Sequence, residues 1–295
     1  MNEIIIKILP IIFIFIVGYI LKKINLFKKE DGDLFLKVVF YVAVPCLILL
    51  SVSKITLDWK LMFLPLIPIV NIIITYFISL FFAKKFNLQA GSFGVFLIAS
   101  MIMNVGFTLP FFIALYGNEG LAKISFFDMG NALIVYSFVY YIACKYGSNP
   151  KHMLAKKILI SPPLWALLVA ILLNVFHYSL PAIDFFQALG NLTTPLIMLA
   201  LGIYFDFKFI KPAPLATILV LRMGLGLLLG IIFVKLFNLE GLNRIVVLVG
   251  SSAPVGYNTV TFSSLENLDK EFAASVVSIS ILIGLITVPL LMYFL

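Results

Sequence analysis

Charged residues are scarce in this chain, and their scarcity indicates the class of protein. Only 12% of the 295 residues are charged, 63% are hydrophobic, and the mean hydropathy is +1.16. A soluble protein of this length carries roughly twice that share of charge, and at most about half of its residues are apolar. The chain is therefore predicted to be an all-α membrane protein that crosses the bilayer many times.

Cysteine and histidine are also rare, with two of each, and this argues against several kinds of site. Cys46 and Cys144 lie inside or at the edge of apolar runs, and neither has another Cys or a His at metal-ligand spacing. A disulfide framework and a zinc site are therefore not expected. The chain also lacks a nucleotide-binding loop, so ATP is not the predicted energy source and no cofactor or metal is expected.

Acidic residues are fewer than basic ones, 13 against 21, which gives a net charge of +8. In a soluble chain this excess would suggest nucleic acid as a partner. Here the lysines flank apolar runs, and positive charge held on the cytoplasmic side of a membrane explains the excess. Nucleic acid is therefore not expected as a partner.

Apolar runs long enough to cross a bilayer of about 30 Å occur ten times along the chain. The seventh run is the weakest of them, because it contains Gln187, Asn191, Thr193 and Thr194. The interruptions between runs are short and leave no room for a soluble domain. The ten runs cover residues 4–21, 34–53, 61–83, 91–116, 121–144, 158–176, 184–205, 213–236, 243–263 and 272–295.

The distribution of lysine and arginine predicts the orientation of these runs. The first run ends at Lys22 and Lys23 without a small-residue cleavage site, so we expect a retained helix and not a signal peptide. With the N-terminus outside, the inner loops hold about twice as many basic residues as the outer segments, and both termini lie outside the cell membrane. The inner residues are Lys22, Lys23, Lys28, Lys29, Lys84, Lys85, Lys145, Lys151, Lys156, Lys157, Lys208, Lys211 and Lys270, and the outer ones are Lys7, Lys54, Lys60, Lys123, Lys235 and Arg244.

Similar proline motifs recur at an offset of about 150 residues. Pro10 corresponds to Pro163 and Pro45 to Pro195, and the polar interruptions of the fourth and ninth runs recur at a similar offset. Five crossings in each half make the second half enter the membrane from the opposite side, so an inverted repeat is predicted. The alternative is chance, because proline is common in membrane helices. The predicted parts are a first five-helix repeat at 1–145, a cytoplasmic linker at 146–157 and a second repeat at 158–295.

Two of the runs are predicted to be broken near the middle of the membrane. Proline removes a backbone donor and glycine loosens a helix, so both segments are expected to unwind. Unwound backbone is tolerated at this depth only where it is buried in protein or lines a wet cavity, and transporters place substrate and ion sites there. The first break is predicted around Asn104, Gly106, Thr108 and Pro110, and the second around Ser251, Ser252, Pro254, Gly256, Tyr257, Asn258 and Thr259.

Two ionisable residues lie at membrane depth. Asp128, with Asn131 three residues later on the same helix face, is a candidate to carry a proton or hold a cation. The alternative is that the helix begins later and Asp128 merely interacts with its N-terminal dipole. Arg222 is a candidate to attract an anionic substrate, unless its side chain extends to the membrane surface. Gly226 and Gly230 form a G-x-x-x-G motif, which more often marks close helix packing than a ligand site.

Five segments together resemble the auxin efflux carrier family over essentially the whole chain. They are V-F-Y-V-A-V-P, N-V-G-F-T-L-P-F-F-I-A-L-Y-G, D-M-G-N-A-L, S-P-P-L-W-A-L and S-A-P-V-G-Y-N-T. The resemblance implies ten helices in two inverted five-helix repeats, with helices 4 and 9 crossing at their breaks, similar to bile-acid symporters and sodium/proton antiporters. It also implies a scaffold of helices 1, 2, 6 and 7 and a mobile transport domain of helices 3–5 and 8–10. Asn104, Gly106 and Pro110 then match the first crossover, Pro254 the second, and Asp128 with Asn131 the motif of helix 5.

The predicted function is secondary transport of a small organic carboxylate by alternating access. A sodium- or proton-coupled cation transporter on the same fold is the main alternative, and transport assays in proteoliposomes separate the two. A membrane sensor without transport is a further alternative, although the short loops give it no output domain. An enzyme is not expected, because the chain lacks a metalloprotease motif and a Ser–His pair at matched depth. The expected partners are an organic anion, a proton or sodium ion, the lipid bilayer and a second copy of the chain.

Overall fold

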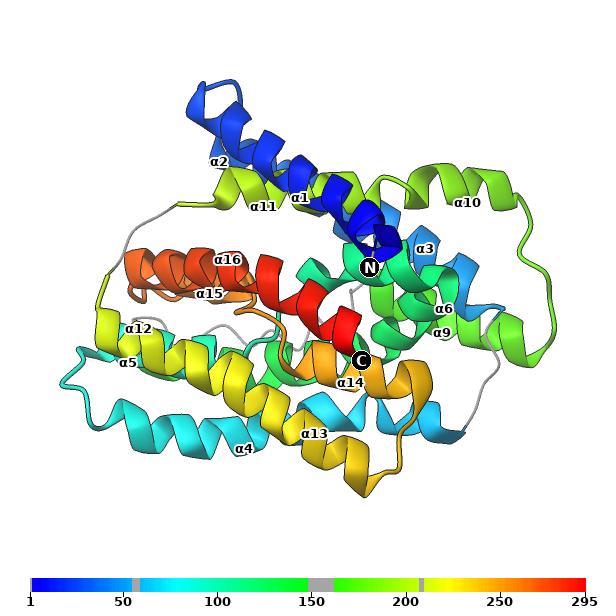
Figure 1. Cartoon of the computed structure of the whole chain (residues 1–295). Helices are drawn as coiled ribbons and strands as arrows, with labels where there is room; N and C mark the ends of the chain where they lie inside the picture. Colours follow the sequence, from blue (N-terminus) through cyan, green and yellow to red (C-terminus); the bar gives the residue numbers. More distant parts are fainter. Residues whose placement is uncertain (1, 55–58, 148–161, 207–209) are drawn as a thin grey trace. The chain divides into compact units, whose positions relative to one another are not determined.

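The computed structural model describes residues 2–54, 59–147, 162–206 and 210–295 (Figure 1). All regular structure in these residues is helical, apart from one isolated antiparallel β-bridge between Met103 and Val255. The predicted all-α class is therefore confirmed for the part of the chain that is described. Most of the predicted linker at 146–157, with Lys151, Lys156 and Lys157, lies outside the described residues, and so does Lys208.

The described helices alternate between long rods and shorter segments joined end to end. The first half contains α1 Asn2–Lys23, α2 Lys29–Val38, η1 Val39–Ala43, α3 Val44–Val52, η2 Trp59–Phe63, α4 Leu66–Ala83, α5 Ala90–Met101, α6 Val105–Ile134, η3 Val135–Val139 and α7 Tyr140–Tyr146. The second half contains α9 Pro162–Val175, α10 Ile183–Gly190, α11 Thr193–Tyr204, α12 Pro212–Leu219, η4 Val220–Leu225, α13 Gly226–Leu236, α14 Gly241–Ser251, α15 Asn258–Leu265 and α16 Lys270–Phe294. Segments η1, η3 and η4 are π-helical, and η2 is a 3₁₀-helix.

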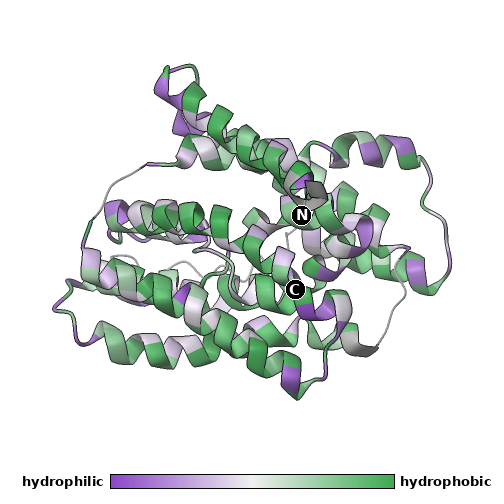
Figure 2. Ribbon diagram, viewed as in Figure 1, coloured by the Kyte–Doolittle hydropathy of each residue, from purple (hydrophilic) through white to green (hydrophobic). Residues whose placement is uncertain are grey.

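Within the described residues, six helical stretches are long and apolar enough to cross a membrane. Figure 2 shows hydrophobic residues along most helices, with hydrophilic residues mainly near their ends and in the connections. Three apolar helices are shorter, and two of them are α5 with 12 residues and α14 with 11. At about 1.5 Å per residue, neither crosses a bilayer of about 30 Å alone. The six stretches are Lys29–Val52, Leu61–Ala83, Val105–Tyr146, Ile183–Tyr204, Pro212–Leu236 and Lys270–Phe294.

The chain divides into two compact units, and each unit draws segments from both halves of the sequence. The first unit contains Met1–Asp58, Gly106–Ser125 and Ile160–Phe205. The second contains Trp59–Val105, Phe126–Leu159 and Asp206–Leu295. The predicted halves at 1–145 and 158–295 are repeats along the sequence and not packing units. The division into compact units therefore does not test them, and they stay a prediction.

Close backbone contact between α1 and α11 holds the first unit together. A side chain at Gly18 would meet the backbone of Leu199, and one at Gly202 would meet the backbone of Phe15 and Tyr19. Small residues let membrane helices approach until their backbones touch, which gains van der Waals contact. At the end of this helix pair that is predicted to be cytoplasmic, Lys22 Nζ donates a hydrogen bond to the carbonyl of Phe205 at 2.6 Å.

The second unit packs α13 against α14 through the predicted G-x-x-x-G motif. A side chain at Gly226 would meet the carbonyl of Ser251, and one at Gly230 would contact the Ser251 side chain at 3.1 Å. The interpretation of this motif as close helix packing is therefore confirmed. In the same unit, α5 lies against α4, α7 and α12, and α15 lies against α16.

Gly117 separates two parts of α6 that the sequence assigns to different membrane runs. Its backbone has φ 57° and ψ −142°, a conformation that glycine adopts far more readily than other residues. It lies between the predicted runs at 91–116 and 121–144. The helix is therefore interrupted where one predicted run ends and the next begins.

Candidate functional site

Two interrupted helices pair with each other inside the second unit. Residues 102–104 separate α5 from α6, and residues 252–257 separate α14 from α15; these two segments are called the crossing below. Met103 and Val255 form the β-bridge. The backbone amide of Asn104 donates to the carbonyl of Pro254, and the backbone amide of Gly256 donates to the carbonyl of Ile102, both at 2.9 Å. Both predicted interruptions are therefore present in the structure.

Side chains bind further backbone groups that the interruptions leave without helical partners. Asn104 Nδ2 donates to the carbonyl of Val255 at 3.4 Å, and Asn131 Nδ2 donates to that of Met103 at 3.4 Å. The amide of Val255 donates to Ser280 Oγ on α16 at 3.0 Å. A buried backbone group without a partner costs free energy comparable to a lost hydrogen bond, so these side chains stabilise the crossing.

Arg222, in the π-helical segment η4, is fully buried against the ends of both half-helices. Its NH1 group donates to the carbonyl of Met101 at 3.1 Å, and its NH2 group donates to the carbonyl of Ser251. Met101 is the last residue of α5, and Ser251 is the last residue of α14. These contacts favour a structural role for Arg222 over the predicted attraction of an anion, and burial excludes the alternative that its side chain extends to the surface.

Asp128 and Asn131 form a polar pair beside the crossing. Asn131 Nδ2 donates to Asp128 Oδ1 at 2.9 Å, so the predicted shared helix face brings the two side chains together. Asp128 lies eleven residues beyond Gly117 and well inside α6, so a position at a helix N-terminus is excluded. Asn131 is buried, and its Oδ1 has no hydrogen-bond partner among the described residues. The pair therefore offers carboxylate and amide oxygens next to the carbonyl of Met103.

The polar residues after the second interruption lie at the start of α15. Asn258 is the first residue of this helix, and its Nδ2 donates to the Tyr136 hydroxyl at 3.4 Å. Thr259 is fully buried, and its Oγ1 has no hydrogen-bond partner among the described residues. Tyr257 and Asn258 are half-buried, whereas Pro254 and Gly256 are buried. Hydroxyl and amide groups thus gather at the positive end of a helix.

The first interruption is shorter than predicted. It ends at Asn104, and Gly106, Thr108 and Pro110 lie within α6, so the prediction that the interruption extends to Pro110 is wrong. Proline cannot donate to the carbonyl four residues earlier, but a membrane helix tolerates it where other groups satisfy that carbonyl. Gly106, Thr108 and Pro110 belong to the first unit, whereas the crossing belongs to the second.

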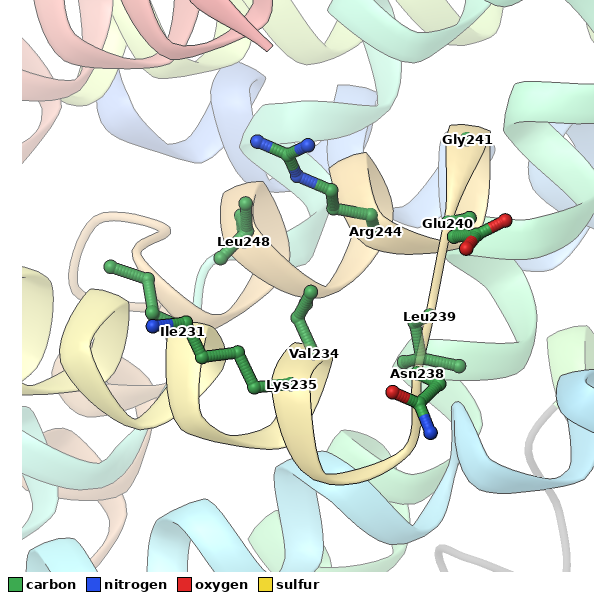
Figure 3. Close-up of a pocket in the computed structure, with 9 residues that line it drawn as sticks. All are labelled: Ile231, Val234, Lys235, Asn238, Leu239, Glu240, Gly241, Arg244 and Leu248. Carbon is green, nitrogen blue, oxygen red and sulfur yellow. The ribbon is translucent and has the colours of Figure 1, made fainter.

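A pocket of about 460 Å³ lies at the connection between α13 and α14 (Figure 3). None of the predicted site residues lines it. Figure 3 shows the Arg244 guanidinium and the Glu240 carboxylate pointing in different directions, so they do not face each other across the pocket. Its lining residues are Ile231, Val234, Lys235, Asn238, Leu239, Glu240, Gly241, Arg244 and Leu248.

An ion pair joins three helices at one end of the second unit. Lys211, before α12, binds Asp269, which caps α16, and Ser92 of α5 donates to Asp269 at 2.7 Å. Partial burial alone would raise the pKa of Asp269, but the hydrogen bonds from Lys211, Ser92 and the amide of Phe272 lower it below its ordinary value. This carboxylate is therefore charged at neutral pH and is a structural tie.

Several residues at or near the crossing had no clear signal in the sequence. Ser280 of α16 accepts from Val255 in the crossing, and Tyr136 of η3 accepts from Asn258 directly after it. Both residue types are common in membrane helices. Glu266, at the end of α15, is 1% exposed and accepts a hydrogen bond from the Tyr140 hydroxyl. A buried acid in an apolar segment is a usable signal, but a position next to a predicted loop conceals it.

Comparison with known proteins identifies the class to which this arrangement belongs. The model of a family described as membrane transport protein matches residues 3–292. The chain belongs to this membrane transport protein family. The match confirms the resemblance to the auxin efflux carriers, and it makes the chain a membrane transporter by family.

Two archaeal transporters are similar to this transporter along their whole length. An uncharacterized transporter of Methanothermobacter thermautotrophicus is 28% identical over 96% of this chain and 95% of its own length. An uncharacterized transporter of Methanocaldococcus jannaschii is 27% identical over 96% of both chains. The similarity therefore covers both units and the crossing.

Proposed function

We propose that this transporter carries a small organic carboxylate by alternating access and binds it at the crossing. The β-bridge between Met103 and Val255 is the observation that carries this proposal, because it joins two unwound segments inside a protein of a transport family. Crossed unwound helices place polar backbone and side chains deep in a bilayer, which is costly and is otherwise rare. Transport gives this polar centre a use.

The groups at the crossing favour an anion over a neutral substrate. The N-terminal ends of α6 and α15 carry partial positive charge, and both helices begin at the crossing. The buried Thr259 Oγ1 has no partner among the described residues and is a donor to a carboxylate oxygen. Asn104 and Asn258 supply amide groups next to the same helix ends, and Gly256 and Tyr257 complete the segment between them.

The two compact units support a division into a scaffold and a moving domain. The first unit contains the segments predicted as helices 1, 2, 6 and 7, and the second contains most of helices 3–5 and 8–10. Asn104 and Val255, 151 residues apart, are hydrogen-bonded, which agrees with the repeat offset of about 150 residues. We infer ten membrane crossings in two inverted repeats, with the second unit moving to carry the substrate.

Cation coupling at Asp128 is a second candidate function, favoured by the oxygens around that residue. The Asp128 carboxylate, the unpartnered Asn131 Oδ1 and the carbonyl of Met103 lie close together. Hard cations bind oxygen ligands of these three kinds. A sodium ion or a proton bound here would couple its gradient to the movement of the crossing.

We infer from the lysine distribution that both termini lie outside the cell membrane. Two variants test this orientation in intact cells, each in a Cys46→Ala, Cys144→Ala background. One has a single cysteine at position 28, and the other has a single cysteine at position 240. An impermeant thiol reagent is expected to leave position 28 unlabelled and to label position 240. Labelling at position 28 with protection at position 240 contradicts the inferred orientation.

Thermal stability of the purified transporter tests the substrate class. A ligand that binds only the folded protein at about 100 times its Kd stabilises it by roughly 2.7 kcal/mol. We expect mono- or dicarboxylates to raise the Tm, and we expect Thr259→Val to remove that rise while keeping the Tm of the unliganded protein. If sodium raises the Tm and carboxylates do not, cation transport replaces the leading proposal.

A further inference from the structure

Arg222 carries a full charge in a fully buried position. Among the described residues it is the largest side chain with less than 2% exposure, and no acidic side chain of that set lies within ion-pair distance of it. A buried charge without compensation is strongly destabilising. Some other negative charge near the guanidinium must therefore balance it.

That negative charge comes from the ends of two helices. Both carbonyls that Arg222 binds, those of Met101 and Ser251, terminate half-helices at the crossing. The C-terminal end of a helix carries about half an elementary negative charge, so two such ends sum to about one. We propose that Arg222 is a positioning residue that neutralises both half-helix ends at once and so holds the two interruptions against each other.

The local structure around Arg222 is shaped for this contact. The π-helical turn Val220–Leu225 widens the helix where the guanidinium leaves it, and such turns often occur at functional sites. Gly226 follows one turn later, and a side chain there would meet both the carbonyl of Ser251 and the Arg222 NH2 group. Asn71 of α4 also donates to the carbonyl of Gly226, at 3.5 Å. The glycine therefore permits the close approach that places Arg222 between the two helix ends.

Arg222 does not compensate the positive ends of the other two half-helices. Arg222 binds the ends of α5 and α14, whereas α6 and α15 begin at the crossing with their positive ends. Arg222 therefore neutralises the negative helix ends and leaves the positive ends of α6 and α15 directed at the crossing. The inference concerns how the crossing is held and does not depend on which substrate binds there.

Thiol reactivity at the crossing tests the proposal without a substrate. Ala253 is fully buried within the second interruption, so Ala253→Cys places a reporter there in a Cys46→Ala, Cys144→Ala background. The native Cys144, in a Cys46→Ala background, reports on the same unit away from the crossing. The rate of reaction with N-ethylmaleimide is measured for each reporter in detergent-purified protein with Arg222, Arg222→Gln and Arg222→Lys.

Arg222→Gln is expected to accelerate labelling at position 253 roughly ten- to a hundredfold, because hydrogen bonds to a charged group are lost at both helix ends. Labelling of Cys144 is expected to stay unchanged. Arg222→Lys retains the charge without the forked guanidinium and should lie between wild type and Arg222→Gln. The proposal is overturned if position 253 is not accelerated, if Cys144 accelerates equally, or if lysine protects no better than glutamine.

A second pair of variants keeps the test decisive if Arg222→Gln does not fold. Gly226→Ala leaves the charge in place but puts a methyl group between Arg222 and Ser251, whereas a methyl group at Gly224 meets only the Val220 side chain at 3.9 Å. Gly226→Ala should accelerate labelling at position 253 selectively, and Gly224→Ala should leave it at the wild-type rate. Equal rates in the two variants would overturn the proposal that the contact between Arg222 and Ser251 holds the crossing together.

Discussion

The two compact units bury very different amounts of polar chemistry. Among the described residues, the first unit buries four polar side chains, whereas the second buries seventeen, including Arg222 and Glu266. The first unit uses glycines instead, at positions 18 and 202, where two apolar helices touch through their backbones. The first unit therefore packs mainly through apolar contacts, whereas the second retains many buried polar groups that require hydrogen-bond partners.

The difference indicates where function is located. Apolar contact needs no specific chemistry, whereas each buried polar group requires a partner and is costly without one. A unit that retains so many polar groups, some without partners, is expected to use them on an ion or a substrate. Substitutions should therefore affect mainly stability in the first unit and mainly transport in the second. Three predictions test this contrast, and a fourth concerns an ion pair of the second unit.

Asp128→Asn in the second unit is expected to have the largest effect, complete loss of ion-driven accumulation. The amide cannot carry a proton or the negative charge that holds a cation, but it fits the same space beside Asn131. Accumulation of substrate in proteoliposomes with and without an imposed sodium or proton gradient measures the loss. Asp33→Asn in the first unit, where the exposed carboxylate accepts from Tyr204, is the matched control and should transport normally. Wild-type gradient dependence in Asp128→Asn would contradict a coupling role.

Asn104→Ala should weaken substrate binding by about 1.5–3 kcal/mol, roughly ten- to a hundredfold in Kd, through loss of hydrogen bonding to a charged ligand. Binding is measured by isothermal titration with the carboxylate that raises the Tm. Asn174→Ala is the control, because this asparagine donates to the carbonyl of Val52 at 2.9 Å within the first unit. The control should lose stability and keep affinity. Equal affinities for all three proteins would exclude the crossing as the binding site.

Gly202→Ala in the first unit should lower the free energy of unfolding by about 1–3 kcal/mol, because the added methyl group forces two backbones apart. The added methyl group would meet the backbone carbonyl of Phe15, which cannot turn aside as a flexible side chain could. Thermal unfolding in detergent measures the loss, and Gly224→Ala, whose added methyl group would contact only the Val220 side chain at 3.9 Å, is the control. A Tm equal to that of the control would contradict close packing of α1 and α11. Substrate affinity in the surviving protein should not change.

The smallest expected effect concerns pH and the tie between Lys211 and Asp269. Because the native pKa of Asp269 is lowered, its contribution is present at neutral pH and is lost as pH falls below its ordinary value of 3.8. The pair is partly exposed, so Asp269→Asn should cost at most about 1 kcal/mol at pH 7. Tm measured against pH should show wild type and variant converging in acid. A constant difference down to pH 3 would contradict the assigned ionisation.

Local chemistry allowed much of the crossing to be predicted from the sequence. Proline and glycine at similar depth identified both interruptions, and the spacing of Asp128 and Asn131 placed them on one helix face. The prediction for Pro110 was wrong, because a proline affects the turn before it and does not set where unwinding ends. Composition therefore locates an interruption, whereas packing determines its length.

The partners of Arg222 were beyond local reasoning. Its two carbonyls come from residues 121 and 29 positions away, and a carbonyl group has no signature in a sequence. The π-helical turns at η1, η3 and η4 were also unpredicted, because they depend on how neighbouring helices fit together. The excess of buried polar groups in one unit likewise becomes visible only once burial is known.

The β-bridge also constrains the order in which the chain is completed in the membrane. Asn104 emerges from the ribosome long before Val255, its partner 151 residues later. Until then the carbonyl of Pro254 and the backbone amide of Gly256 do not exist, and the unwound backbone at 102–104 lacks the hydrogen bonds that they form, in a medium that offers few others. We therefore expect the first half to be retained by the insertion machinery until the ninth run arrives, and truncation before residue 255 to yield a chain that is degraded.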